Sequence, residues 1–371
     1  MINLDYAATT PVHQDVLDAM LPYFCENYAN ASSMYTDARM IRKAIDASRK
    51  TIAQEIHAQS SEIYFTSGGT ESDNWAILGS AFSRPEKRHI ITSQVEHHAV
   101  LNSCKAREDL GWEITYVPVD NQCRVSAKDI MMAIRPDTAL ISVMLANNEV
   151  GTIEPIEEIA TLAHSNGILM HTDAVQAVGH IPVDVKQLDV DMLSISAHKF
   201  GGPKGIGALY IRSGIALKNL IYGGAQERGL RGGTENTPAI VGFAKALSLS
   251  SIRMKENRDA IESMRNRLGA ELSDLPGIRL NASETLKLPS HLHISVDGFS
   301  SQMLLMKLDM MGIAASAGSA CASGAAERSH VVLAMGIAGE NQADIRFTIG
   351  ENTTIQEIDR AAAVLKSILC K

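Results

Sequence analysis

The sequence predicts an α/β protein in which a mostly parallel, seven-stranded sheet lies between helices and a smaller α+β domain follows. Short apolar runs alternate with amphipathic helical stretches from about residue 38 to residue 250. Such alternation is typical of a parallel sheet covered by helices on both faces. The length of 371 residues and the hydrophobic share of 45% are sufficient for two domains with cores of normal size.

The seven predicted strands are short apolar runs rich in Val, Ile, Leu, Tyr and Phe. They span residues 62–66, 88–92, 113–119, 138–145, 167–174, 191–197 and 207–211. Between them, residues 47–57 and 156–167 have helical spacing, and Gly167 is suited to end the second of these helices. The densest basic stretch, residues 39–50, is spaced like the solvent-facing side of an amphipathic helix.

The smaller domain is predicted from the part of the chain that follows residue 250. Residues 253–275 have the pattern of one long helix, and an α+β pattern comes after it. Its segments are residues 291–296, 300–312, 344–350 and a final helix from about 354 to 369. We therefore expect a large domain of residues 16–250 and a small domain of residues 1–15 with 251–371.

Composition excludes several classes of protein. A net charge of −8 without a cluster of Lys and Arg argues against binding to nucleic acid or to an anionic membrane. No signal peptide and no run of about 18 apolar residues is present, so no membrane span is expected. The five cysteines form no CxxC and the histidines no HExxH, which argues against a metal site. The odd, scattered cysteine count fits a reducing cytoplasm.

Polar residues gather where the predicted strands end, which is where open α/β sheets bind ligands. After the first strand, a Gly-Gly pair that includes Gly69 precedes Thr70 and a helix, whose free N–H groups suit a phosphate. Other strand ends carry Asn148, Asp173, Ser196, His198 and Lys199. Taken singly, Asp173 is equally explained as a helix cap and Lys199 as an exposed loop charge.

Together these residues suit pyridoxal phosphate. That cofactor requires a lysine for its Schiff base, a cradle for its phosphate and a carboxylate that keeps the pyridine nitrogen protonated. A hydrogen-bond donor near the phenolic oxygen completes the set, and Asn148 or Gln176 is available for that role.

Nine motifs carry a resemblance to a known family over nearly the whole chain. They are LDYAATTP (4–11), FTSGGTESDN (65–74), EHHAV (96–100), NNEVGT (147–152), HTDAVQ (171–176), SAHKFGGPKGIGALY (196–210), ERGLRGGTEN (227–236), GSACASG (318–324) and IRFTIG (345–350). The chain resembles the cysteine desulfurases of the NifS/IscS type, in the class V aminotransferase branch of fold-type I pyridoxal-phosphate enzymes. The motifs occur in the order that the family has.

The resemblance implies a cofactor site. Lys199 would form the Schiff base, Asp173 would pair with the pyridinium nitrogen, and His97 would stack on the ring and assist proton transfer. The phenolic oxygen and the phosphate would be held by Gln176, Asn148, Gly69, Thr70, Ser196 and His198. In this family Thr234 reaches the phosphate of the neighbouring subunit, which implies a homodimer with shared sites.

The resemblance also implies the reaction. L-cysteine would bind with its carboxylate at Arg346, near Asn148, and would leave as L-alanine. Cys321 would attack the substrate sulfur and keep it as a persulfide for an acceptor protein. The acceptor is an iron–sulfur scaffold, a tRNA-thiolation protein or a member of a cofactor pathway. The segment SAGSACASG (316–324) contains only small residues around Cys321. This composition by itself is compatible with either a mobile loop or a tight turn.

The sequence departs from the family pattern without losing a residue that performs chemistry. The departures are Ala31, Tyr35, Ala225, Gly232, Ala317 and Arg328. Alternative functions are a selenocysteine lyase or another class V pyridoxal-phosphate enzyme, and, in a different class, a sulfur-transfer scaffold with little turnover of its own. The intact set of Lys199, Asp173 and Cys321 argues against the scaffold.

Overall fold

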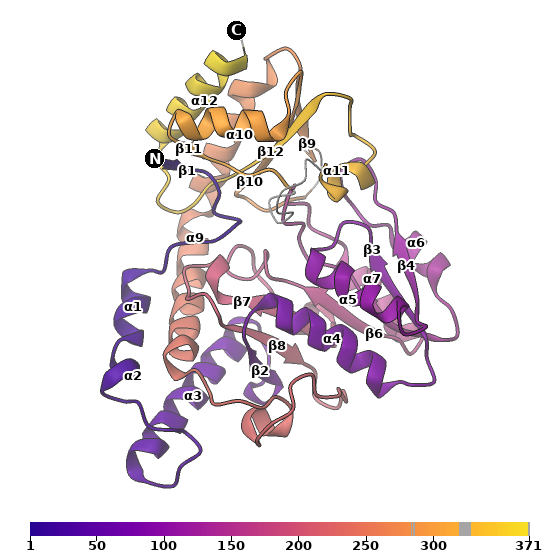
Figure 1. The fold of residues 1–371 in the computed structure, drawn as a ribbon, viewed down its shortest axis with the longest axis vertical. Coiled ribbons are helices and arrows are strands. Elements are labelled where there is room, and N and C mark those ends of the chain that lie inside the picture. The colour runs from indigo at the N-terminus through magenta and orange to yellow at the C-terminus, as the bar shows by residue number, and fades with distance from the viewer. Residues whose placement is uncertain (283, 285, 319–327, 370–371) are drawn as a thin grey trace.

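A computed structural model describes residues 1–371 except 283, 285, 319–327 and 370–371. Its central sheet has seven strands in the order β2-β8-β7-β6-β5-β3-β4 (Figure 1). They are β2 (Ile63–Thr66), β3 (His89–Ser93), β4 (Glu113–Val117), β5 (Thr138–Ser142), β6 (Leu169–Asp173), β7 (Met192–Ser196) and β8 (Gly207–Ile211). Strands β4, β3, β5, β6 and β7 are parallel, whereas β8 is antiparallel to both β7 and β2. The prediction of a mostly parallel, seven-stranded sheet is confirmed.

Helices cover both faces of this sheet, because successive strand residues point to opposite sides. Ile90 and Leu140 pack with residues of α4 and α5, while Ile91 and Ile141 pack with residues of α3, α7 and α9. The helices of this part are α1 (Gln14–Met20), α2 (Pro22–Cys25), α3 (Thr36–Glu55), α4 (Gly69–Ser83), α5 (His98–Glu108), α6 (Ala127–Ala133), α7 (Ile156–Ser165), α8 (Val185–Leu188) and α9 (Thr237–Ser273).

A separate hydrophobic cluster forms from residues of both chain ends. It includes Leu4, Leu268 and Phe347, which are all fully buried. The elements around it are β1 (Ile2–Asn3), β9 (Ile278–Asn281), β10 (His291–Asp297), α10 (Ser301–Met310), β11 (Ile313–Ala314), β12 (Gln342–Thr348) and α12 (Ile355–Leu369), and α11 (His330–Ala334) lies between β11 and β12 in the chain. Strands β12-β10-β9 form an antiparallel sheet, and β1 pairs with β11.

Helix α9 differs from the prediction. It begins at Thr237 rather than at residue 253, and Figure 1 shows it running from the central sheet to the second cluster. Its first half is buried on several sides, with Phe243 and Leu247 in the core of the central sheet. A segment that is apolar on several sides lacks the one-sided period by which a helix is recognised in sequence.

Arg49 corrects the prediction that the basic stretch 39–50 faces solvent. It lies in α3, four residues after Ile45 and three before Ile52, on the buried side of the helix, and only 6% of it is exposed. No helix in the described part of the chain is long and apolar enough to span a membrane.

Candidate active site

The predicted phosphate cradle is the turn at Gly68 and Gly69, between β2 and α4. Other parts of the chain approach its backbone closely. Gly68 has a φ of 151°, and helix α4 begins at Gly69 with no side chain capping its first turn. A Cβ at Gly69 would lie 2.7 Å from Val175 Cγ2, and one at Gly207 would lie 2.7 Å from the Cα of Gly68. Only glycine fits these positions, which leaves the amides at the positive end of α4 open to an anion.

Ser196 lies beside this cradle. It is the last residue of β7, and its Oγ would lie 3.7 Å from a Cβ at Gly68. Thr70 is exposed in the first turn of α4. His198 lies two residues after Ser196 in the chain, and its Nδ1 is 3.1 Å from the Oγ1 of Thr9. Burial, aided by the charges of Lys199 and Lys204, lowers the pKa of His198 to about 4, so this side chain is neutral at pH 7.

Asp173 ends β6 in a buried position, with 5% of the residue exposed. Its Oδ1 accepts a hydrogen bond from the N–H of Val175 at 2.9 Å. Burial raises the pKa of Asp173 to about 6, against the effects of that hydrogen bond and of the positive charge of Lys199. Asp73 of α4 lies behind it, and burial and the charge of Asp173 raise the pKa of Asp73 well above its usual range. Of the two carboxyl groups, Asp173 is therefore the one that ionises near neutral pH.

A buried polar row supports this pair. Nε2 of His171 lies 3.7 Å from Oδ1 of Asp73, and Ser142 and Ser194 form hydrogen bonds with Nδ1 and Nε2 of His171. Burial lowers the pKa of His171 to about 3. The row is thus neutral and adds no positive charge that would compete with a cation at Asp173.

His97 caps helix α5, because its Nδ1 accepts the N–H of Ala99 at 3.1 Å. The other ring nitrogen, Nε2, therefore carries the proton of the neutral ring. Burial, together with the positive charges of Lys199, His98 and His330, lowers the pKa of His97 to about 4. At pH 7 His97 is a neutral, flat ring of the kind that stacks on an aromatic cofactor.

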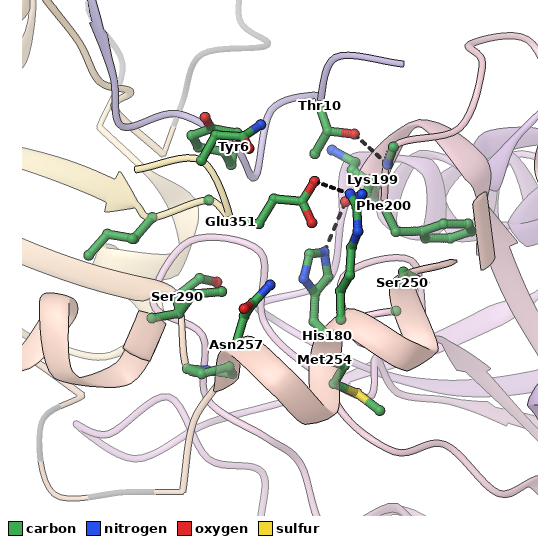
Figure 2. Close-up of a pocket in the computed structure, with 18 of the residues that line it drawn as sticks. Tyr6, Thr10, His180, Lys199, Phe200, Ser250, Met254, Asn257, Ser290 and Glu351 are labelled. Carbon is green, nitrogen blue, oxygen red and sulfur yellow. Dashed lines mark hydrogen bonds and ion pairs between the residues drawn. The ribbon is translucent and has the colours of Figure 1, made fainter. Parts of the chain in front are cut away.

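Lys199 follows β7 in a short 3₁₀ turn, Ala197–Lys199. Its Nζ donates to the carbonyl oxygens of Ala7 at 2.7 Å and Ala8 at 3.0 Å, and Gln176 donates to the same Ala7 oxygen at 3.0 Å. The N-terminal segment thus lies across the side chain of Lys199. His180 fixes the backbone of Lys199, because its Nε2 is 2.9 Å from the Lys199 carbonyl oxygen (Figure 2).

A cavity bordered by Lys199 lies between α9 and the N-terminal segment. Ser250, Met254 and Asn257 of α9 line it, and Figure 2 shows Asn257 pointing toward Glu351. Lys199 and Gln176 line this cavity, but the cradle and Asp173 do not. Of the predicted cofactor residues, Lys199 and Gln176 therefore border this cavity, and the phosphate cradle and Asp173 lie outside its lining.

The two residues predicted to bind the substrate are in contact. Arg346 of β12 donates to the carbonyl oxygen of Asn148 at 2.7 Å and to the Oδ1 of Asp5 at 2.8 Å. Its buried Nε has no hydrogen-bond partner among the described residues. Arg346 also pairs through its backbone with Ser316, and Ser316 is the first residue of the segment 316–324 that carries Cys321. Cys321 itself lies outside the described residues.

Thr234 is exposed, and no contact with the cradle of its own chain is recorded for it in the described part of the structure. Sequence reasoning missed other residues of this region: the carbonyl groups of Ala7 and Ala8, the buried Asp73 and His171, and the ion pairs of Glu71 and Glu227. LDYAATTP was recognised as a motif, but nothing local indicates that its backbone meets Lys199. Among the described residues, no group of His, Cys, Asp and Glu side chains could hold a metal ion.

Comparison with known proteins identifies the family of the chain and its fold. Residues 2–361 match the family described as Aminotransferase class-V. A solved structure titled NIFS-LIKE PROTEIN aligns with a TM-score of 0.93 and 36% identity, covering 100% of this chain and 99% of the other. The chain belongs to the class V aminotransferase family, and its predicted fold class is confirmed.

The relatives narrow the assignment within that family. The chain is 47% identical to cysteine desulfurase IscS of Methanosarcina thermophila, over 100% of this chain and 92% of the relative. It is 47% identical to the protein of the same name from Dictyoglomus turgidum, over 100% of this chain and 95% of the relative. A structure titled SspA in complex with cysteine aligns with a TM-score of 0.82 and 36% identity, over 94% of this chain and 99% of the other. The predicted resemblance to cysteine desulfurases of the NifS/IscS type is confirmed.

Proposed function

We propose that this enzyme is a pyridoxal-phosphate-dependent cysteine desulfurase, which converts L-cysteine to L-alanine and transfers the sulfur to Cys321. The observation that carries the proposal is the meeting of three strand ends: the glycine cradle after β2, Asp173 at the end of β6 and Lys199 after β7. A lysine, a buried carboxylate and an anion cradle at one sheet edge match the three polar ends of pyridoxal phosphate.

The residues present fit that cofactor. The open first turn of α4, with Gly69, Thr70 and Ser196, would hold the phosphate, and His198, two residues after Ser196 in the chain, would assist. Asp173 would pair with the ring nitrogen, since its raised pKa falls when a cation adjoins it. When bound, pyridoxal phosphate supplies an electron sink for bonds at the substrate Cα.

Side chains of this protein would carry out the proton transfer, the substrate binding and the sulfur transfer. The amine of Lys199 would take the Cα proton of L-cysteine, and His97, stacked on the cofactor ring, would assist the proton transfer. Arg346 holds the substrate carboxylate in a two-pronged hydrogen bond. The thiolate of Cys321 forms a bond to the substrate sulfur, the carbon–sulfur bond breaks, and the carbon takes a proton to give the methyl group of alanine.

The persulfide on Cys321 then passes to a sulfur-acceptor protein, of which an iron–sulfur cluster scaffold is the first candidate. The proposal includes a homodimer in which the exposed Thr234 contacts the partner's phosphate group, and a cytoplasmic location. It also keeps the division into a large domain of residues 16–250 and a small domain of residues 1–15 with 251–371.

The test is to load the purified protein with pyridoxal phosphate, add L-cysteine, and measure alanine and sulfide with and without a thiol reductant. We expect alanine in both cases and sulfide only with reductant, because the sulfur stays on Cys321 until it is reduced. Cys321→Ala keeps the cofactor's visible absorbance and loses sulfide release, whereas Lys199→Ala loses both products. Sulfide release at the wild-type rate by Cys321→Ala would show that another group receives the sulfur. Higher turnover with L-selenocysteine would favour the lyase.

A further inference from the structure

The outer edge of β2 is covered by side chains instead of a further strand. β2 is the end strand of the sheet and leads directly into the phosphate cradle. The carbonyl oxygen of Ile63 accepts from Arg49 at 2.8 Å and from Arg228 at 2.7 Å, and the N–H of Phe65 donates to Glu227 at 3.0 Å. Arg228 and Glu227 belong to the segment 226–234, which ends at Thr234, and this segment is called here the Thr234 loop.

A buried ion pair fixes the beginning of the Thr234 loop. Arg49 and Glu227 form a two-pronged pair with nitrogen–oxygen distances of 2.6 and 2.8 Å, and their side chains are only 7% and 4% exposed. Glu227 and Arg228 both have left-handed backbone angles, with φ of 47° and 57°. Two successive non-glycine residues adopt that conformation only where their surroundings enforce it. The loop therefore has one shape at this point, and the pair holds it on β2.

A second ion pair ties the Thr234 loop to the cradle itself. Arg231 donates to both carboxylate oxygens of Glu71, at 2.9 and 3.1 Å. Glu71 stands in the first turn of α4, and it also accepts the N–H of Ser67 at 2.8 Å. Ser67 and Glu71 flank the glycine pair and Thr70. The Arg231–Glu71 pair therefore joins the loop to the residues on either side of the cradle.

We propose that Glu71 and Arg231, together with Arg49 and Glu227, are positioning residues for the cofactor phosphate. They hold the Thr234 loop against the cradle of their own chain, so that Thr234 is presented at a set place. This inference rests on the proposed function, in which Thr234 reaches the phosphate of the partner subunit. Thr234 is exposed three residues after Arg231, as that role requires. Loss of a pair should then weaken binding of the phosphate more than binding of the ring.

The experiment compares two probes on the apoprotein, pyridoxal phosphate and pyridoxal, which lacks the phosphate. Their dissociation constants are measured by absorbance for wild type, Glu71→Gln and Arg231→Lys at a concentration at which sedimentation shows dimers. These variants are used because the Glu71–Arg231 pair is partly exposed. Breaking the buried Arg49–Glu227 pair would leave an unpaired buried charge and would destabilise the fold more. Arg267→Lys is the matched control, since Arg267 makes a similar two-pronged pair with Asp359 far from the cradle.

We expect Glu71→Gln and Arg231→Lys to weaken pyridoxal phosphate about tenfold and pyridoxal by less than about twofold. Arg267→Lys should change neither constant, and the exchange Glu71→Arg with Arg231→Glu should restore most of the lost affinity. Equal losses for both probes, or no loss for either, would overturn the inference while leaving the proposed function intact. A wild-type protein that binds pyridoxal phosphate no better than pyridoxal would overturn both.

Discussion

Replacing Glu96 by glutamine should remove a pH dependence of stability. Glu96 directly precedes His97 in the chain and is fully buried. Its Oε1 accepts hydrogen bonds from Ser93 Oγ at 2.6 Å and from the N–H of Met144 at 3.0 Å. Its Oε2 has no hydrogen-bond partner among the described residues. Burial, aided by the negative charges of Asp173 and Glu154, raises the pKa of Glu96 to about 8.

The magnitude follows from linkage. Between pH 4.5 and about 8 the unfolded chain has lost the proton of Glu96 while the folded chain keeps it. Because the folded state binds more protons, the free energy of unfolding falls by about 1.4 kcal/mol for each pH unit in this range. The full loss is about 5 kcal/mol and is complete above the folded pKa. Glutamine has the shape of the protonated acid and carries no charge. The free energy of unfolding of Glu96→Gln should therefore not fall through this cause as the pH rises.

The assay is urea unfolding of the apoprotein at fixed protein concentration, from pH 5.5 to 7.5. We expect the stability of Glu96→Gln relative to wild type to rise by about 3 kcal/mol over these two pH units. Glu158→Gln, on the exposed side of α7, serves as control and should give a constant difference. Parallel curves for wild type and Glu96→Gln would mean that Glu96 is already ionised at pH 5.5, and the reasoning would be refuted.

Three further predictions concern the site and the core. Asp173→Asn should keep pyridoxal phosphate bound and lower the rate of alanine formation about a hundredfold, because the ring nitrogen loses its counter-charge; an unchanged rate would remove Asp173 from the mechanism. Arg346→Lys should raise the KM for L-cysteine about tenfold with a smaller change in kcat, since lysine cannot form the two-pronged bond; a loss in kcat alone would contradict this. Phe243→Ala should lower the free energy of unfolding by about 3–5 kcal/mol, measured in urea, since Phe243 is fully buried against Phe65 and Phe200.

Local chemistry in the sequence was enough to predict the central sheet and to select the residues proposed to bind the cofactor. Strand runs such as 207–211 were located with their bounds, because buried strands are short, apolar and β-branched. Lys199, Asp173 and the glycine pair were found because each follows a strand, and parallel strands end at one edge. The start of α9 was missed, since its buried first half has no one-sided pattern.

What only the tertiary structure decided is which polar groups meet. The amino-acid sequence by itself determined that seven strands form a mostly parallel sheet, and it supplied residue types that suit a pyridoxal-phosphate enzyme. The order of the strands within the sheet came from the structure. The sequence did not show that Arg49 is buried, because its partner Glu227 lies 178 residues further along the chain. Nor did it show that the carbonyl oxygens of Ala7 and Ala8 reach Lys199. Period and propensity depend on neighbours within a few residues, whereas the burial and pairing of a charge depend on groups that only folding brings together.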